Sequence, residues 1–158
     1  MSGPALRLAG EGLCLRPLRA ADDPPAVGGE DRAALRERLW AGDFWSPTTQ
    51  VWAAEAGGCV CGYLEVARLR PDTLRLERGE APAGEPRQAA LRTLAEYAFA
   101  TFAGLGRLEA IVWPGDVAWR ADLQAVGFRS EGTLRGYRLT DGRLGDVRCL
   151  CLCRADWC

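Results

Sequence analysis

The sequence predicts a single α/β domain built on one mixed, mostly antiparallel central sheet with helices on both faces. Three observations predict it. Strand-like segments fill residues 51–79, a helix, a strand and a second helix follow over 88–126, and an Asp-Gly turn at 141–142 separates two more strand-like segments. At 158 residues the chain can bury about 70% of its unfolded surface. We therefore expect one domain over residues 1–158.

The first third of the chain is expected to hold one strand and helical segments. Residues 13–19 alternate apolar and polar side chains, and the acidic and proline residues of 22–25 suit the first turn of a helix. A short helix is predicted over residues 31–40 and a loop over residues 42–47. The aromatic side chains of this region make it our candidate substrate pocket: Trp40, Phe44 and Trp45.

The middle of the chain has the pattern of an antiparallel meander. Its strand-like segments span 51–56, 59–70 and 73–79, and they are separated by Gly57-Gly58 and Pro71-Asp72. A turn-rich loop is expected over residues 79–87. After it, apolar residues recur at helical spacing from 88 to 102, which predicts the clearest amphipathic helix of the chain.

The last third predicts a strand, a helix and a hairpin. The strand is expected over 108–113, and the helix from Pro114 to about Val126, where Gly127 ends it. Segments 132–140 and 143–153 flank Asp141-Gly142, which is a strong hairpin signal. The strand, loop and helix around position 85 mark the place where a phosphate would lie, because a helix N-terminus offers free amides.

Composition removes several classes of mechanism. The sequence has neither His nor Lys, so it cannot build a Ser-His-Asp or Cys-His nucleophile, an imidazole metal site or a lysine Schiff base. The 20 basic and 21 acidic residues give a net charge of -1, so we expect no nucleic-acid partner. No apolar run of membrane-spanning length and no signal peptide is visible, so we expect a cytoplasmic protein without membrane contact.

The seven cysteines are expected to be reduced. Their number is odd, and Cys149, Cys151 and Cys153 alternate along one predicted strand, which holds their Cα atoms about 7 Å apart. Small apolar core residues are the favoured interpretation. No metal site is predicted, because no CxxC spacing accompanies them.

Several segments along nearly the whole chain carry a family resemblance. They are LCLRPLRAAD at 13–22, LRTLAEYAF at 91–99, RLEAIVW at 107–113, LQAVGFRSEGTLRG at 123–136 and DGRLGDVRCLCLCRADW at 141–157. These segments resemble the RimJ/RimL-like branch of the GNAT N-acetyltransferases. The resemblance implies a GNAT-like sheet, acetyl-CoA as donor, a splayed fourth and fifth strand around its pantetheine arm, and direct acyl transfer to an amine.

The phosphate loop of the family is altered in this chain. The family pattern is Arg/Gln-x-x-Gly-x-Gly/Ala, and counting back from 91–99 places residues 82–87 on it with no match. A shift by one residue would put Gly84 at the first glycine. Pro86 has no N–H to offer a phosphate and Glu85 adds a negative charge, whereas Arg87 could pair with phosphate. The residues assigned to the donor here are Gly84, Arg87 and Gln88.

A second departure follows the fifth predicted strand. The family usually has Asn there with Ser three residues later, and this chain has Asp116 and Trp119. Asp116 could accept hydrogen bonds from the pantetheine arm, so we include it among the donor-binding candidates. The alternative is that Asp116 caps the helix and Trp119 fills the core.

Acid-base chemistry must rest on carboxylates, tyrosines or cysteines, since histidine is absent. Glu65 and Glu77 are our candidate catalytic bases, because each lies in a strand near the expected cleft. The alternative is that both are solvent-facing strand residues paired with arginines.

Three functions remain open from the sequence. The first is an acyl-CoA-dependent N-acyltransferase that acts on a primary amine of a small molecule or a peptide N-terminus, with a homodimer as a further expectation. The second is a repurposed or silent member that binds another ligand or performs other chemistry, for example in secondary metabolism. The third is an interaction module that presents Trp40, Phe44 and Trp45 to a partner.

Overall fold

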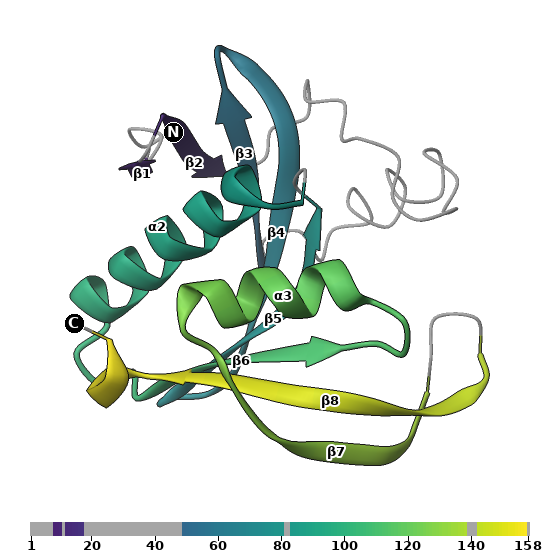
Figure 1. Ribbon diagram of the computed structural model, residues 1–158. Coiled ribbons are helices and arrows are strands. Elements are labelled where there is room, and N and C mark those ends of the chain that lie inside the picture. Colours follow the sequence, from purple (N-terminus) through teal and green to yellow (C-terminus); the bar gives the residue numbers. More distant parts are fainter. Residues whose placement is uncertain (1–7, 11, 18–48, 81–82, 139–141, 158) are drawn as a thin grey trace.

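The computed structural model describes residues 8–10, 12–17, 49–80, 83–138 and 142–157. One sheet of eight strands runs through this part of the chain in the order β1-β2-β3-β4-β5-β6-β8-β7 (Figure 1). Every neighbouring pair is antiparallel except β5 and β6, which are parallel. The strands are β1 (Leu8–Gly10), β2 (Leu13–Pro17), β3 (Thr49–Ala56), β4 (Cys59–Arg70), β5 (Thr73–Glu80), β6 (Arg107–Val112), β7 (Arg129–Arg138) and β8 (Leu144–Cys153).

The predicted meander is confirmed as β3, β4 and β5, and the predicted first strand as β2. The short strand β1 was not predicted, and it pairs with β2 through three residues only. The helix expected over 31–40 lies outside the described residues, as do Trp40, Phe44 and Trp45.

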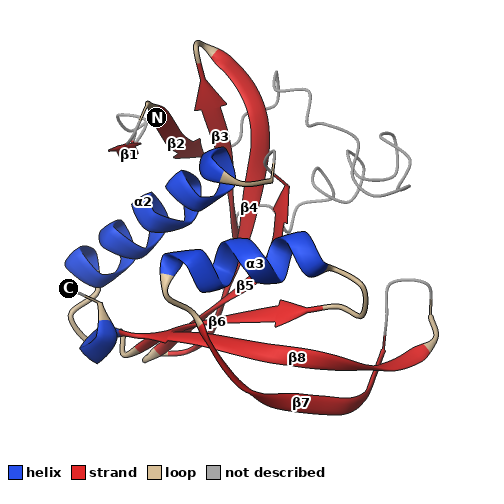
Figure 2. Cartoon of the chain, in the orientation of Figure 1, coloured by secondary structure: helices blue, strands red, loops and turns tan. Residues whose placement is uncertain are grey.

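Two α-helices occur in the described residues, α2 (Glu85–Thr101) and α3 (Val117–Val126), and a short 3-10 helix, η2 (Arg154–Asp156), follows β8. Figure 2 shows α2 and α3 on the same face of the sheet, where they contact each other. The core lies between them and the sheet, with Leu91, Leu94 and Leu123 packed on Leu76, Leu108 and Leu150. Neither α-helix is long and apolar enough to cross a membrane.

Helix α2 begins three residues earlier than the sequence indicated. Glu85, Pro86 and Arg87 were expected in a loop, but they form its first turn. Proline is tolerated there because the first amides of a helix have no intrahelical acceptor and its ring already has a helical φ. The turn-rich segment is therefore shorter than expected, and Gly84 is the residue that precedes the helix.

The last third of the chain has the predicted order of elements, although α3 begins at Val117 rather than Pro114 and β7 at Arg129 rather than Gly132. Helix α3 ends at Gly127, whose φ of 113° is in the left-handed region that glycine favours. β7 and β8 form an antiparallel pair on either side of the predicted turn. Residues 139–141 of that turn lie outside the described residues.

Candidate functional site

The two parallel strands separate at the centre of the sheet. Residues 73–76 of β5 pair with residues 107–110 of β6, but β5 continues to Glu80 and β6 to Val112 without further pairing to each other. Helix α2 follows β5 and helix α3 follows β6, so the beginnings of both helices lie beyond the unpaired strand ends (Figure 1). The other edges of these strand ends pair with β4 and β8, so only the edges that face each other lie outside the sheet pairing. The backbone N–H and C=O groups of such edges can bind an extended ligand.

A buried carboxylate joins the two helices beyond this separation. Asp122, in the middle of α3, accepts the backbone N–H of Gly84 at 3.0 Å and the side-chain amide of Gln88 at 2.8 Å. Arg87 donates its Nε to the same carboxylate at 2.7 Å. We call these four residues the Asp122 clamp: Gly84, Arg87, Gln88 and Asp122.

The clamp keeps Asp122 ionised. Burial disfavours a charged carboxylate, but the hydrogen bonds from Gln88, Gly84 and Arg87 and the positive charge of Arg87 outweigh it, and the pKa of Asp122 is lowered. Asp122 is only 4% exposed and Arg87 only 8%. The beginning of α2 therefore already holds an anion, supplied by the chain itself.

The Trp119 ring packs against the guanidinium of Arg87. The guanidinium carbon of Arg87 lies 5.3 Å from the centre of the Trp119 ring, which is a cation–π arrangement. Trp119 is buried and donates its indole N–H to the backbone oxygen of Ile111 at 3.2 Å. The prediction that Trp119 fills the core is confirmed.

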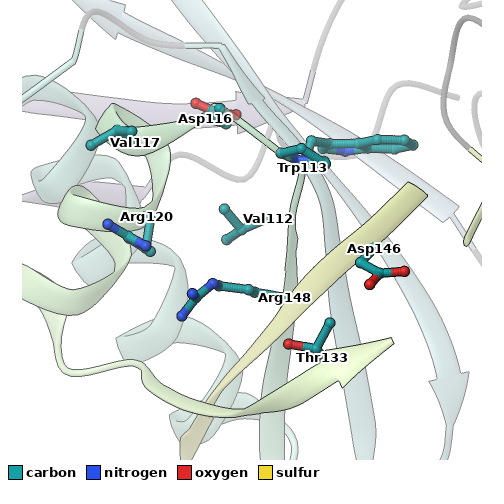
Figure 3. A pocket seen from close by; sticks show the side chains of 10 residues that line it. Val112, Trp113, Asp116, Val117, Arg120, Thr133, Asp146 and Arg148 are labelled. Atoms are coloured by element: carbon teal, nitrogen blue, oxygen red, sulfur yellow. The ribbon is translucent and has the colours of Figure 1, made fainter. Parts of the chain in front are cut away.

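Asp116 caps α3. Its carboxylate accepts the backbone N–H of Trp119 at 3.3 Å, as the capping interpretation predicted. Asp116 also lines a cavity of about 290 Å³ between the start of α3 and strands β6, β7 and β8. Figure 3 shows Arg120 and Arg148 on one side of this cavity and Asp146 on the other.

The cavity has a cationic side. Among the described residues, the guanidinium groups of Arg120 and Arg148 have neither a hydrogen bond nor an ion pair. Asp146 instead accepts the backbone N–H of Gly136 at 3.1 Å. The charge of this side suits an anionic group. It could not be predicted from the sequence, because the two arginines come from α3 and β8.

Comparison with solved structures identifies the fold. A candidate GNAT-family acetyltransferase from Chromobacterium violaceum is 21% identical with a TM-score of 0.80, and the match covers 99% of this chain and 90% of that one. A second candidate acetyltransferase is 25% identical with a TM-score of 0.76, and the match covers 99% of this chain and 90% of that one. The chain has the GNAT fold. RimJ of Mycobacterium smegmatis, solved with CoA-disulfide, is 22% identical with a TM-score of 0.71 over 98% of this chain and 88% of that one.

These likenesses are structural. No protein-family model matches the sequence, and no curated protein matches it. The sequence-based resemblance to the GNAT acetyltransferases is confirmed by the fold, including the splayed strand pair, which is β5 and β6 here because β1 precedes the first predicted strand.

The described part of the predicted phosphate loop is the turn before α2 and the first turn of that helix. Gly84 precedes α2 with a φ of 89°, a conformation that favours glycine, and a Cβ at this position would meet nothing within 4 Å. This conformation is compatible with the alignment shifted by one residue, in which Gly84 stands at the first glycine. Gly84, Arg87 and Gln88, all assigned to the donor from the sequence, are brought together by the structure, and all three bind Asp122.

Glu65 and Glu77 lie on the neighbouring strands β4 and β5. In the backbone register Glu65 pairs with Arg78 and Val66 with Leu76, so Glu77 is the extra residue of a β-bulge. Bulges of this kind redirect side chains and occur often next to active sites. The structure therefore places both candidate bases at one irregular point of the sheet, and it describes their backbone positions only.

Other charged residues and thiols gather on the sheet face that α2 and α3 do not cover. Glu109 of β6 is 7% exposed and lies 3.1 Å from a guanidinium nitrogen of Arg107 and 3.2 Å from one of Arg75. The ligand atoms of Glu131, Cys151 and Cys153 lie within 4.8 Å of one another, but Arg107 already donates to Glu131. This cluster could not be predicted from the sequence, because β5, β6, β7 and β8 each supply part of it.

The described cysteines are free, as predicted. Cys151 is buried and Cys59 is exposed, so the core interpretation holds for some of them only. Burial raises the pKa of Cys151, Cys149 and Cys61. These three are therefore protonated thiols at neutral pH and unsuited to act as nucleophiles.

Proposed function

We propose that the chain is an acyl-CoA-dependent N-acyltransferase of the RimJ/RimL-like type that acts on a primary amine of a small molecule or a peptide N-terminus. The observation that carries the proposal is the separation of β5 and β6 inside a GNAT fold, beside the beginnings of α2 and α3. A structure of the same fold, RimJ of Mycobacterium smegmatis, was solved with CoA-disulfide. Acetyl-CoA is the donor we propose.

In the proposed reaction the lone pair of a neutral amine attacks the carbonyl carbon of the thioester. The new C–N bond forms, the C–S bond breaks, and the proton lost by the amine reaches the leaving thiolate directly or through a protein base. A carboxylate is the base available, since the sequence lacks histidine. Glu65 and Glu77 are the proposed candidates because their backbone positions both lie at the β4–β5 bulge.

The described residues fit one end of acetyl-CoA better than the other. The unpaired ends of β5 and β6 offer backbone partners to the amide groups of a pantetheine arm. The beginning of α2 does not fit a pyrophosphate. The Gly84 N–H already donates to Asp122, and Pro86 has no N–H to donate. This disagreement is the observation that favours the second candidate function, a repurposed GNAT fold that binds another ligand.

Thermal unfolding in the presence of acetyl-CoA separates the two candidates. A ligand that binds only the folded chain stabilises it, by about 2.7 kcal/mol at a concentration of about 100 times its Kd. We expect the melting temperature to rise with acetyl-CoA concentration. An unchanged melting temperature at millimolar acetyl-CoA contradicts the acyltransferase and leaves the repurposed fold.

Mass spectrometry on a panel of primary amines then tests transfer. We expect an acetylated product with at least one amine, and a loss of about 100-fold or more in kcat for Glu65→Gln or Glu77→Gln if that residue is the base. The matched control is Glu96→Gln on the exposed side of α2. If kcat is unchanged in both Glu65→Gln and Glu77→Gln, neither carboxylate is the base.

The proposal also covers the domain organisation and the cellular location of the enzyme. One domain over residues 1–158 is proposed, and a cytoplasmic location is proposed because the described cysteines are free thiols, which persist in a reducing compartment.

A further inference from the structure

Resting on the proposed acyl transfer, we propose that this chain recognises its donor through the pantetheine arm alone. The phosphates and the nucleotide of CoA then add no affinity, and the substrate class is any acyl thioester that presents a pantetheine arm. The residue that determines this specificity is Asp122, which fills the anion position at the beginning of α2 with its own carboxylate.

The backbone donors at the beginning of α2 are largely taken. The Gly84 N–H donates to Asp122, and the Gln88 N–H donates to the Gly84 oxygen at 3.0 Å inside the helix. Pro86 has no N–H. Between residues 84 and 88, this leaves the amides of Glu85 and Arg87 without a described acceptor. A phosphate-binding loop works by aiming several successive N–H groups at one anion, and two separated amides do not make one.

The side-chain charges also oppose a phosphate. Asp122 is buried and ionised, and the exposed carboxylate of Glu85 lies in the first turn of the same helix. The cation that could compensate, Arg87, is held between Asp122 and the Trp119 ring. A second arginine near this helix start, Arg92, lies 3.5 Å from Glu85 in an ion pair.

Exchange of Asp122 for a phosphate is unfavourable too. If a phosphate took over Arg87, the carboxylate of Asp122 would stay in its buried position without its cation. Removing one partner of a buried ion pair is strongly destabilising, because the remaining charge loses its compensation without regaining water. The clamp therefore favours its own carboxylate over an incoming anion.

The pantetheine arm needs none of these groups. It is a neutral chain with two amides, and the unpaired ends of β5 and β6 present backbone N–H and C=O groups of the kind that bind extended amides. Recognition by the strands and exclusion of phosphate by the clamp are thus separate properties of neighbouring elements.

Calorimetric titration of the full chain with CoA, pantetheine and adenosine 3′,5′-bisphosphate tests the proposal. We expect the Kd values of CoA and pantetheine to agree within about tenfold, and no binding of the nucleotide at millimolar concentration. CoA binding that is tighter than pantetheine binding by more than about tenfold overturns the proposal and leaves the acyltransferase intact. Binding of none of the three contradicts the acyltransferase itself.

A variant assigns the effect to Asp122. Asp122→Asn keeps the shape of the side chain and removes its charge, so we expect the affinity for CoA to rise about tenfold relative to that for pantetheine. Asp156→Asn, an exposed carboxylate of η2, is the matched control and should leave the ratio unchanged. An unchanged ratio in folded Asp122→Asn overturns the role of Asp122. If the variant does not fold, the wild-type titrations still decide the proposal.

One more titration shows whether the pantetheine arm comes from a small thioester or from a carrier protein. A carrier protein that bears phosphopantetheine is compared with the same carrier without it. Binding of the loaded carrier alone makes carrier-bound thioesters the donor, and binding of neither makes small thioesters the donor. Recognition through the arm is contradicted if both carriers bind equally and an excess of pantetheine does not abolish their binding.

Discussion

The carboxylate of Asp122 lies 3.0 Å from the backbone nitrogen of Gly84 and accepts its N–H. This hydrogen bond connects the middle of α3 to the residue before α2, and so connects the helices that follow the two separating strands. Arg87 and Gln88 bind the same carboxylate. The clamp thereby connects the two helix beginnings, and we propose that it also limits what this region binds.

Asp122→Ala should lower the free energy of unfolding by about 3–5 kcal/mol, because it leaves the buried guanidinium of Arg87 without its carboxylate. Urea denaturation followed by circular dichroism measures the change. The double variant Arg87→Met with Asp122→Leu should recover most of the loss, since an apolar pair can replace a buried ion pair. Equal destabilisation in the single and double variants would contradict the clamp.

The contribution of Asp122 to stability should depend on pH. Its pKa is lowered in the folded chain, so its contribution is complete above the unfolded value of about 3.9 and disappears as the pH falls through the folded value. The difference in unfolding free energy between wild type and Asp122→Asn should therefore be constant above about pH 5 and shrink below about pH 4. Denaturation at a series of pH values checks this, and a difference that grows on acidification refutes it.

Asp116→Ala should cost about 1 kcal/mol, because the first turn of α3 loses its cap. Asp116→Ser should retain most of the stability, since serine is also a good cap. Denaturant midpoints measure both variants. If Asp116→Ala were as stable as the wild type, the capping role would be wrong. The cavity beside Asp116 would then be the remaining reason for a carboxylate at this position.

Thiol labelling should distinguish the cysteines by exposure. Cys59 is exposed, whereas burial raises the pKa of Cys151 and Cys149 and lowers their thiolate fraction. With Ellman's reagent near pH 8, Cys59→Ser should remove one thiol from the rapid phase, and Cys151→Ser should leave that phase unchanged. A rapid phase that loses a thiol in Cys151→Ser would show that β8 opens in solution.

Much of the fold could be predicted because local signals and packing agree. The α3 helix has its cap at Asp116 and its stop at Gly127, and both are visible in the sequence. The start of α2 was misplaced because Glu85 and Pro86 resemble loop residues, although proline fits a first turn well. Single short strands such as β1 lack a distinguishing pattern, since three residues cannot show a period.

The candidate site was only partly predictable. The family resemblance indicated Gly84, Arg87 and Gln88 through the position of its phosphate loop. It did not indicate Asp122, which looks like an ordinary polar position 35 residues after Arg87. Its role arises when α3 packs on α2 and turns Asp122 toward the beginning of that helix. The polar cavity with Arg120 and Arg148 was missed for the same reason, because its two cations meet only in the folded chain.

A crystal structure of the chain with bound CoA tests the account most directly. We expect the pantetheine arm between the unpaired ends of β5 and β6, the Asp122 carboxylate still bonded to the Gly84 N–H, and the phosphates without backbone hydrogen bonds from α2. A pyrophosphate bonded to the Gly84 N–H, with Asp122 displaced from Arg87, would contradict the account.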